Sequence, residues 1–174
     1  MKRALCVLLV LAATPVLAQE KNPVTSAVKE IVPRQQKNLV GAAEAMPAEK
    51  YAYKPTEKQM TFGHLILHVI ESNNHLCSKI SDIAEPKPAA PAKESDGKDK
   101  LVPALKASFD FCASALSKVD DSKLADEIEL FGGRKGSRAF GLIALTSGWA
   151  DHYGAAAIYL RLNGLLPPTA QAKQ

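Results

Sequence analysis

The chain has few aromatic residues and few glycines for its length. Aromatic side chains make up 6% of its 174 residues, and only 10 residues are glycine. β-Barrels and β-sandwiches need strands rich in aromatic and β-branched side chains, joined by many turns. The composition therefore argues against those folds. With 47% hydrophobic and 23% charged residues, it fits one helical domain.

Features of nucleotide and nucleic-acid binding are also missing from the sequence. No glycine-rich phosphate-binding motif occurs, and no strip of basic residues is interleaved with aromatics. The net charge is +4, and it falls to +2 if residues 1–18 are removed, because 20 basic residues then face 18 acidic ones. A charge this small predicts no nucleic-acid partner.

The first 18 residues have the three parts of a secretory signal peptide. Lys2 and Arg3 give a positive start, residues 4–13 form an apolar run, and residues 16–18 end in small side chains. We expect cleavage after Ala18 and export to the periplasm or beyond. The alternative is a retained anchor helix, but the run is shorter than the roughly 20 apolar residues of a membrane span. No stable membrane span is expected after cleavage.

Cysteine usage agrees with export. Of the three cysteines, Cys6 lies in the signal and leaves Cys77 and Cys112. An even pair in an exported chain predicts one disulfide bond. The alternative is two buried thiols, since a free cysteine packs like a small hydrophobic residue.

Apolar residues recur at helical spacing in four stretches, which predicts an all-α four-helix bundle over residues 19–168. The expected helices cover residues 25–45, 61–84, 101–119 and 137–162. Pro33 lies inside the first stretch, so that helix is expected either to kink there or to begin at Pro33.

Three further segments lack this periodicity. Residues 85–100 contain three prolines and alternating charges, which predicts a solvated Pro/Lys-rich connector. Residues 120–138 mix charges with glycines, and we expect an irregular loop with at most one helical turn at 124–128. Residues 169–174 are expected to be a flexible C-terminal tail.

The four histidines are unevenly placed. His64, His68 and His75 fall on one flank of the second helix, and His152 borders the core side of the fourth. Two histidines that face one bundle interior could share a divalent metal ion. The alternative is that His68 and His152 are core-edge histidines held by ordinary hydrogen bonds.

Several of these stretches together resemble the DinB-like family. The matching segments are residues 61–68, residues 73–77 and residues 152–164 with the prolines that follow. The closing segment, Tyr-Leu-Arg-Leu-Asn-Gly, is the most specific. The resemblance implies a four-helix bundle that holds a divalent metal with three histidines. One of these comes from the second helix and two, spaced four apart, from the last.

Only two of these three ligands are present here. His68 matches the ligand of the second helix and His152 the second of the spaced pair, but the first of that pair is Gly148. Water, a substrate atom or His64 could complete the set. Catalytic zinc usually has three protein ligands and an open position, so two histidines predict that zinc or nickel binds weakly or not at all.

The resemblance also implies a pocket at this end of the bundle. Trp149, Tyr153 and Tyr159 are expected to line or close it, and Gly148 to leave room in it. These features predict an exported, non-catalytic or small-ligand-binding protein with a degenerate metal site. The alternative is a divalent-metal-dependent enzyme of hydrolase or thiol-transferase type that uses His68 and His152. A partner-binding module that uses the connector and a homodimer are both left open.

Overall fold

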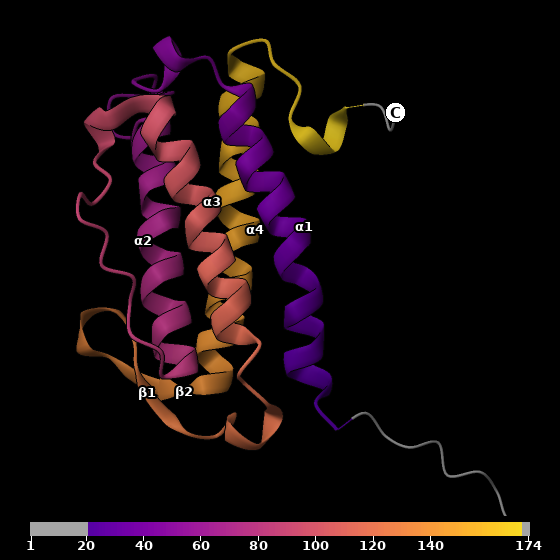
Figure 1. Ribbon diagram of the computed structural model, residues 1–174. Coiled ribbons are helices and arrows are strands. Elements are labelled where there is room, and N and C mark those ends of the chain that lie inside the picture. Colours follow the sequence, from indigo (N-terminus) through magenta and orange to yellow (C-terminus); the bar gives the residue numbers. More distant parts are fainter. Residues whose placement is uncertain (1–20, 172–174) are drawn as a thin grey trace, which may run out of the picture.

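The computed structural model describes residues 21–171, and within them four long helices form a bundle (Figure 1). This confirms the expected all-α fold. The helices and strands are α1 (Pro23–Ala45), α2 (Phe62–Ser81), α3 (Gly97–Leu116), β1 (Glu127–Glu129), β2 (Lys135–Ser137) and α4 (Arg138–Leu162). The expected signal peptide lies outside the described residues, as do residues 172–174.

The bundle has a square arrangement in which α1 and α2 occupy one diagonal. Both of these helices pack against α3 and α4. The core between them is filled mainly by aliphatic side chains, with Phe62, Phe109 and Trp149 as the large aromatic members. Within the described residues, no helix is both long enough and apolar enough to span a bilayer.

Hydroxyl side chains cap the N-termini of α2 and α4. The hydroxyl of Thr61 accepts a hydrogen bond from the His64 amide, and Ser137 caps α4 in the same way. α1 runs unbroken from Pro23, so the alternative start at Pro33 is not observed. α2 ends at Ser81, earlier than expected, because Asp82 adopts the left-handed conformation with φ of 61°.

α3 begins at Gly97, four residues before the expected start at Leu101. The residues that look like solvated connector form its first turn: Lys98 donates to the carbonyl of Glu44, and Lys100 pairs with Asp96. Contacts with α1 and a preceding charged turn therefore extend the helix beyond its apolar periodicity. Pro103 lies inside the helix as a result, and not in its first turn.

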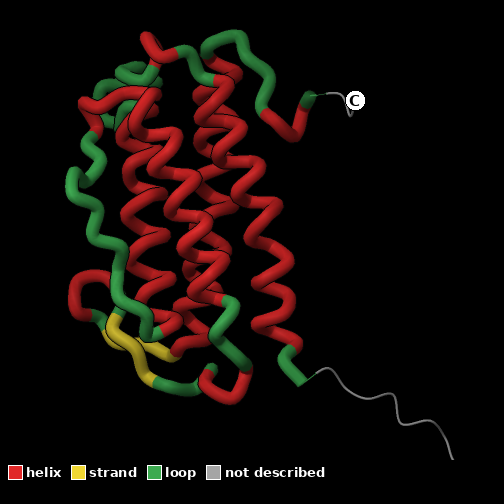
Figure 2. The backbone as a smooth tube through the Cα atoms, in the orientation of Figure 1, coloured by secondary structure: helices red, strands yellow, loops and turns green. Residues whose placement is uncertain are grey.

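The loop before α4 contains a β-hairpin that the sequence did not predict (Figure 2). β1 and β2 are antiparallel, with Ile128 opposite Gly136. The expected helical turn at 124–128 is therefore wrong for Glu127 and Ile128. The reason is tertiary: the side chain of Ile128, in β1, is buried against α4 beside Gly141.

Arg138 ties this hairpin to the ends of α2 and α4. Its side chain is only 5% exposed, and its guanidinium donates to the carbonyl of Ile80 and, over 3.0 Å, to the carboxylate of Asp82. Its backbone amide donates to the carbonyl of Asp126. The hairpin is thus held against the end of the bundle.

The C-terminal segment is ordered beyond the expected boundary at residue 168. Pro168–Ala170 form a short 3-10 helix, and Thr169 bonds to the hydroxyl of Tyr153 on α4. The domain therefore includes residues that composition alone assigned to a flexible tail.

Cys77 and Cys112 form a disulfide bond, which confirms the predicted pairing. Their Cα atoms are 5.2 Å apart, and the bond joins α2 to α3 across the connector. Both cysteines are fully buried. The two cysteines are 35 residues apart in the sequence, and the segment between them includes the Pro/Lys-rich connector, which has little apolar surface of its own.

Removing this disulfide should destabilise the fold. The double variant Cys77→Ala/Cys112→Ala is expected to lose about 3 to 4 kcal/mol in free energy of unfolding, because the cross-link restricts the unfolded chain. Denaturant titration measures the loss. Reductant should bring the wild type to the level of the variant and leave the variant unchanged. A reduced wild type, verified by thiol titration, with undiminished stability would contradict this account.

Candidate functional site

A cavity of about 380 Å³ opens between α2, α4 and the hairpin. Its walls are mostly apolar, with a small number of polar groups, as is usual for small-molecule sites. It is lined by His68, Val69, Ser72, Asn73, Leu76, Leu130, Phe131, Arg134, Phe140, Ala144, Leu145, Gly148, Trp149 and His152. Within the described part of the chain, no aspartate or glutamate lines it.

The structure brings His68 and His152 together in this cavity. Their ring centroids are 4.8 Å apart and their planes are nearly perpendicular, at 83°. Two imidazoles bound to one tetrahedral zinc ion would have centroids about 5 Å apart, given Zn–N distances of about 2.0 to 2.1 Å. The pair therefore has suitable spacing for two positions of a metal site.

His152 lies where its charged form is disfavoured. Burial lowers the pKa of His152 below its ordinary value, and the neighbouring His68 lowers it further. The carboxylate of Asp151, 3.8 Å away and largely exposed, acts in the opposite direction. A neutral imidazole at this position can accept or donate a hydrogen bond, or bind a metal ion.

Gly148 lies one turn before His152 and lines the same cavity. A Cβ atom added there would meet only the Nε2 atom of His152, at 3.9 Å. The cavity thus has room for a side chain at the position where the resemblance implies a third histidine.

His64 does not join the other two histidines. Its Nδ1 atom lies 3.1 Å from Glu94 at the end of the connector, and its side chain is about half exposed. It is not part of the cavity lining. Among residues 21–171, no group of three or more His, Cys, Asp or Glu side chains is placed to hold a metal ion. The residues present therefore supply two ligands of the implied set and do not complete it.

Tyr153 and Tyr159 lie away from the cavity, unlike Gly148 and Trp149. Tyr153 turns to the other side of α4, where its hydroxyl bonds to Thr169 over 2.8 Å. Tyr159 lies seven residues beyond His152, about 10 Å further along the helix. Its hydroxyl donates to the carbonyl of Met60 over 2.7 Å, at the opposite end of α2 from the hairpin.

A buried amide that sequence reasoning missed joins the two walls of the cavity. The indole N–H of Trp149 donates to the Asn73 Oδ1 atom over 2.6 Å, and the amide nitrogen of Asn73 donates to Ser108 on α3 over 3.0 Å. Asn73 is fully buried. The available signal was a polar residue on the apolar stripe of the second helix, between Val69 and Leu76.

The hairpin and the first turn of α4 supply the mouth of the cavity. Phe131 stacks on His75 with ring centroids 4.4 Å apart and is half exposed. The guanidinium of Arg134 lies 4.7 Å from the ring centre of Phe140. These residues were not predicted as site residues, because their loop carries no periodic pattern that would place them over α2.

Comparison with known protein families shows to which family this chain is related. A sequence model described as the DinB superfamily matches residues 33–153, which include His68, Gly148 and His152. The chain belongs to the DinB superfamily. This confirms the resemblance seen in its second and fourth helices.

Solved DinB-like structures have the same fold. A DinB-like protein from Bacillus subtilis has a TM-score of 0.66 and 20% identity, covering 84% of this chain and 99% of its own. One from Bacillus cereus has a TM-score of 0.67 and 14% identity, covering 82% and 95% respectively. A conserved protein from Enterococcus faecalis has a TM-score of 0.63 and 16% identity, covering 80% and 96%. At these identities the likeness shows the fold alone.

No curated protein matches this DinB superfamily member. Membership supplies the four-helix bundle, but it does not supply an activity, because one fold hosts many functions. The chemistry of the site must come from its own residues.

The depressed pKa of His152 predicts acid-sensitive stability. In the unfolded chain His152 takes up a proton near its ordinary pKa of about 6.5, whereas the folded chain resists it. The unfolded state then binds more protons, so the free energy of unfolding falls as the pH drops below about 6.5. His152→Gln should lose less stability between pH 7 and pH 5 than the wild type, measured by denaturant titration.

Asp151→Asn provides the opposite control. It removes the charge that raises the pKa of His152, so its loss of stability below pH 6.5 should be at least as steep as in the wild type. Equal acid sensitivity in the wild type and His152→Gln would show that His152 is not held neutral by the fold.

Proposed function

We propose that this DinB superfamily member is an exported, non-catalytic protein that binds a small ligand in the cavity between α2, α4 and the hairpin. The observation that carries the proposal is the pairing of His68 with His152 beside Gly148, in a cavity of about 380 Å³. Space is available where a third ligand would lie, and apolar walls surround two imidazoles. Such a site suits an organic ligand better than a metal ion that needs three protein ligands.

The ligand that fits this lining is a small apolar molecule with an acidic group. Trp149, Leu145 and Phe140 provide apolar surface, and Arg134 lies at the mouth. A guanidinium pairs well with a carboxylate, while a neutral imidazole can donate a further hydrogen bond to it. No acidic side chain of the described lining would repel such a group.

Export is part of the same proposal. It rests on the signal-like residues 1–18, and the disulfide between Cys77 and Cys112 supports it. Disulfides persist in oxidising compartments and are rare in the cytosol. The periplasm or the exterior is therefore the compartment in which we expect the protein to work.

The second candidate is a divalent-metal-dependent enzyme of hydrolase or thiol-transferase type. The spacing of His68 and His152 favours it, because two imidazoles at 4.8 Å suit two metal positions. Against it stands the missing third ligand, since His64 pairs with Glu94 elsewhere. Metal content separates the candidates: stoichiometric zinc or nickel in the purified wild type would favour the enzyme.

Ligand binding can be followed through Trp149, which is the only tryptophan in the chain and lines the cavity. We expect phenylacetate to change its fluorescence in a saturable manner, and 2-phenylethanol, which lacks the acid, to bind at least about tenfold more weakly. Arg134→Gln should weaken phenylacetate binding and leave the alcohol unaffected.

Lys135→Gln is the matched control for this experiment. It removes the next cation along the chain, which pairs with Glu127 and does not line the cavity. Its affinity for phenylacetate should equal that of the wild type. Equal affinities for phenylacetate and 2-phenylethanol would contradict the preference for an acidic ligand. If neither probe gave a saturable change in fluorescence, the result would contradict a small-ligand site.

Restoring the missing imidazole tests the degenerate metal site. Gly148→His should bind zinc or nickel at least about tenfold more tightly than the wild type, because it adds a third nitrogen ligand one turn from His152. The cavity has room for the side chain. Replacing glycine also favours the helix by up to about 1 kcal/mol. Calorimetric metal titration measures the affinity.

Gly148→Ala separates the ligand effect from the helix effect. It should raise helix stability without raising metal affinity. If Gly148→His binds metal no better than Gly148→Ala, then Gly148 is not the position of the missing ligand. Tight metal binding by the wild type would instead favour the enzyme.

A further inference from the structure

α4 is apolar on its outer face as well as on the face that enters the core. Three large aliphatic side chains project into solvent: Ile143 is 64% exposed, Ile158 56% and Leu162 57%. A helix that is apolar on all sides is usually enclosed on all sides. In the described chain, however, the packing of α1 and α2 against α4 leaves these three side chains exposed.

The same outer face carries one acidic and one basic residue, Asp151 and Arg161. Asp151 is 86% exposed at its side chain, and Arg161 is also exposed. Their separation of ten residues corresponds to about 15 Å along the helix. Their midpoint lies between Gly154 and Ile158, which share this face.

This placement makes the face complementary to itself. When two copies of α4 run antiparallel about a two-fold axis near the midpoint, Asp151 of each copy comes level with Arg161 of the other. Ile158 of each copy likewise comes level with Gly154 of the other. A two-fold interface requires each patch to match itself in this way.

Gly154 provides the space at the centre of this contact. An added Cβ atom there would meet no other atom within 4 Å, so the fold itself does not require a glycine. A glycine inside a helix costs up to about 1 kcal/mol relative to alanine. Its absence of a side chain lets a second helix approach closely at the level of Ile158.

We infer that the outer face of α4 is a homodimer interface in which two copies pack antiparallel and exchange Asp151–Arg161 ion pairs. Burial of Ile158 and Leu162 contributes the hydrophobic part of the association, and the two symmetric ion pairs fix its direction. This inference does not rest on the proposed function, because the face is turned away from the core and the ion pairs lie outside the ligand cavity.

Charge exchange gives the sharpest test. The protein, purified as the host cell processes it, should sediment as a dimer at about 100 µM in low salt. Asp151→Arg and Arg161→Asp should each weaken the dimer at least about tenfold, because each replaces two attractions by two repulsions. The double variant Asp151→Arg/Arg161→Asp should return to within about threefold of the wild type.

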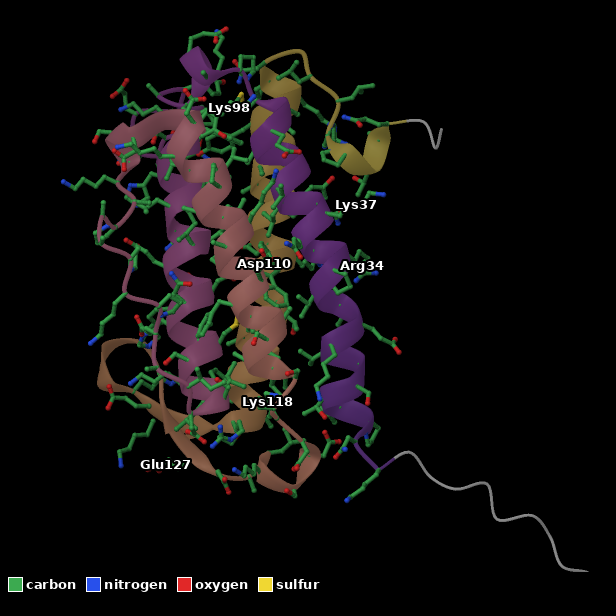
Figure 3. The ribbon with its side chains drawn as sticks, viewed as in Figure 1. Arg34, Lys37, Lys98, Asp110, Lys118 and Glu127 are labelled. Carbon is green, nitrogen blue, oxygen red and sulfur yellow. A yellow bond between two sulfur atoms is a disulfide. The ribbon has the colours of Figure 1, made fainter. Side chains whose placement is uncertain are left out.

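Two further variants complete the test. Asp110→Arg makes the same charge change on α3, at the exposed position labelled in Figure 3, and should leave the dimer unchanged. Gly154→Leu should give a folded monomer, because its side chain fills the space at the centre of the contact. Circular dichroism verifies that each variant is folded.

A wild type that stays monomeric at this concentration would overturn the inference. So would a dimer that the single charge changes leave intact, or one that the double exchange fails to restore. A dimer undisturbed by Gly154→Leu would place the interface on another face and would equally overturn it.

Discussion

The hydrogen bond from the Trp149 indole to the Asn73 amide sets the rotation of α4 against α2. It joins two fully or almost fully buried side chains, and breaking it would leave a buried polar group unpaired at a cost of about 1 to 3 kcal/mol. Because Asn73 also donates to Ser108, the constraint extends to α3. His68 and Asn73 lie on α2, and His152 and Trp149 lie on α4. The rotation of α4 that allows the hydrogen bond between Trp149 and Asn73 therefore also brings the two imidazoles together.

The walls and the mouth of the cavity are held in place by different contacts. The walls from α2 and α4 are fixed by the bundle core and by the buried amide. The mouth comes from the hairpin, where Phe131 is half exposed and Arg134 is exposed. Arg138 anchors the hairpin to the end of α2 through its buried guanidinium. The two bundle helices therefore carry the histidines, while the loop before α4 carries Phe131 and Arg134 at the mouth.

α4 serves two surfaces because it is apolar on both sides. Its inner side contributes Leu142, Leu145 and Trp149 to the core, and its outer side presents Ile158 and Leu162 to solvent. The fourth helix was recognisable from the helical spacing of its apolar residues. The exposure of its outer apolar residues could not be predicted from the sequence, because it depends on which side of α4 the helices α1 and α2 cover.

The sequence by itself determined the approximate extents of the four helices, the disulfide partners and the DinB relationship, and that relationship implied that His68 and His152 face each other. Helical periodicity and capping are local properties, and they place residues on faces that must meet in a bundle. Only the tertiary structure decided the hairpin, the early start of α3 and the positions of Tyr153 and Tyr159. These depend on contacts between distant segments, such as Ile128 beside Gly141, Lys98 with Glu44, and Tyr153 with Thr169. A helical wheel gives the direction of a side chain, but only packing gives its neighbour.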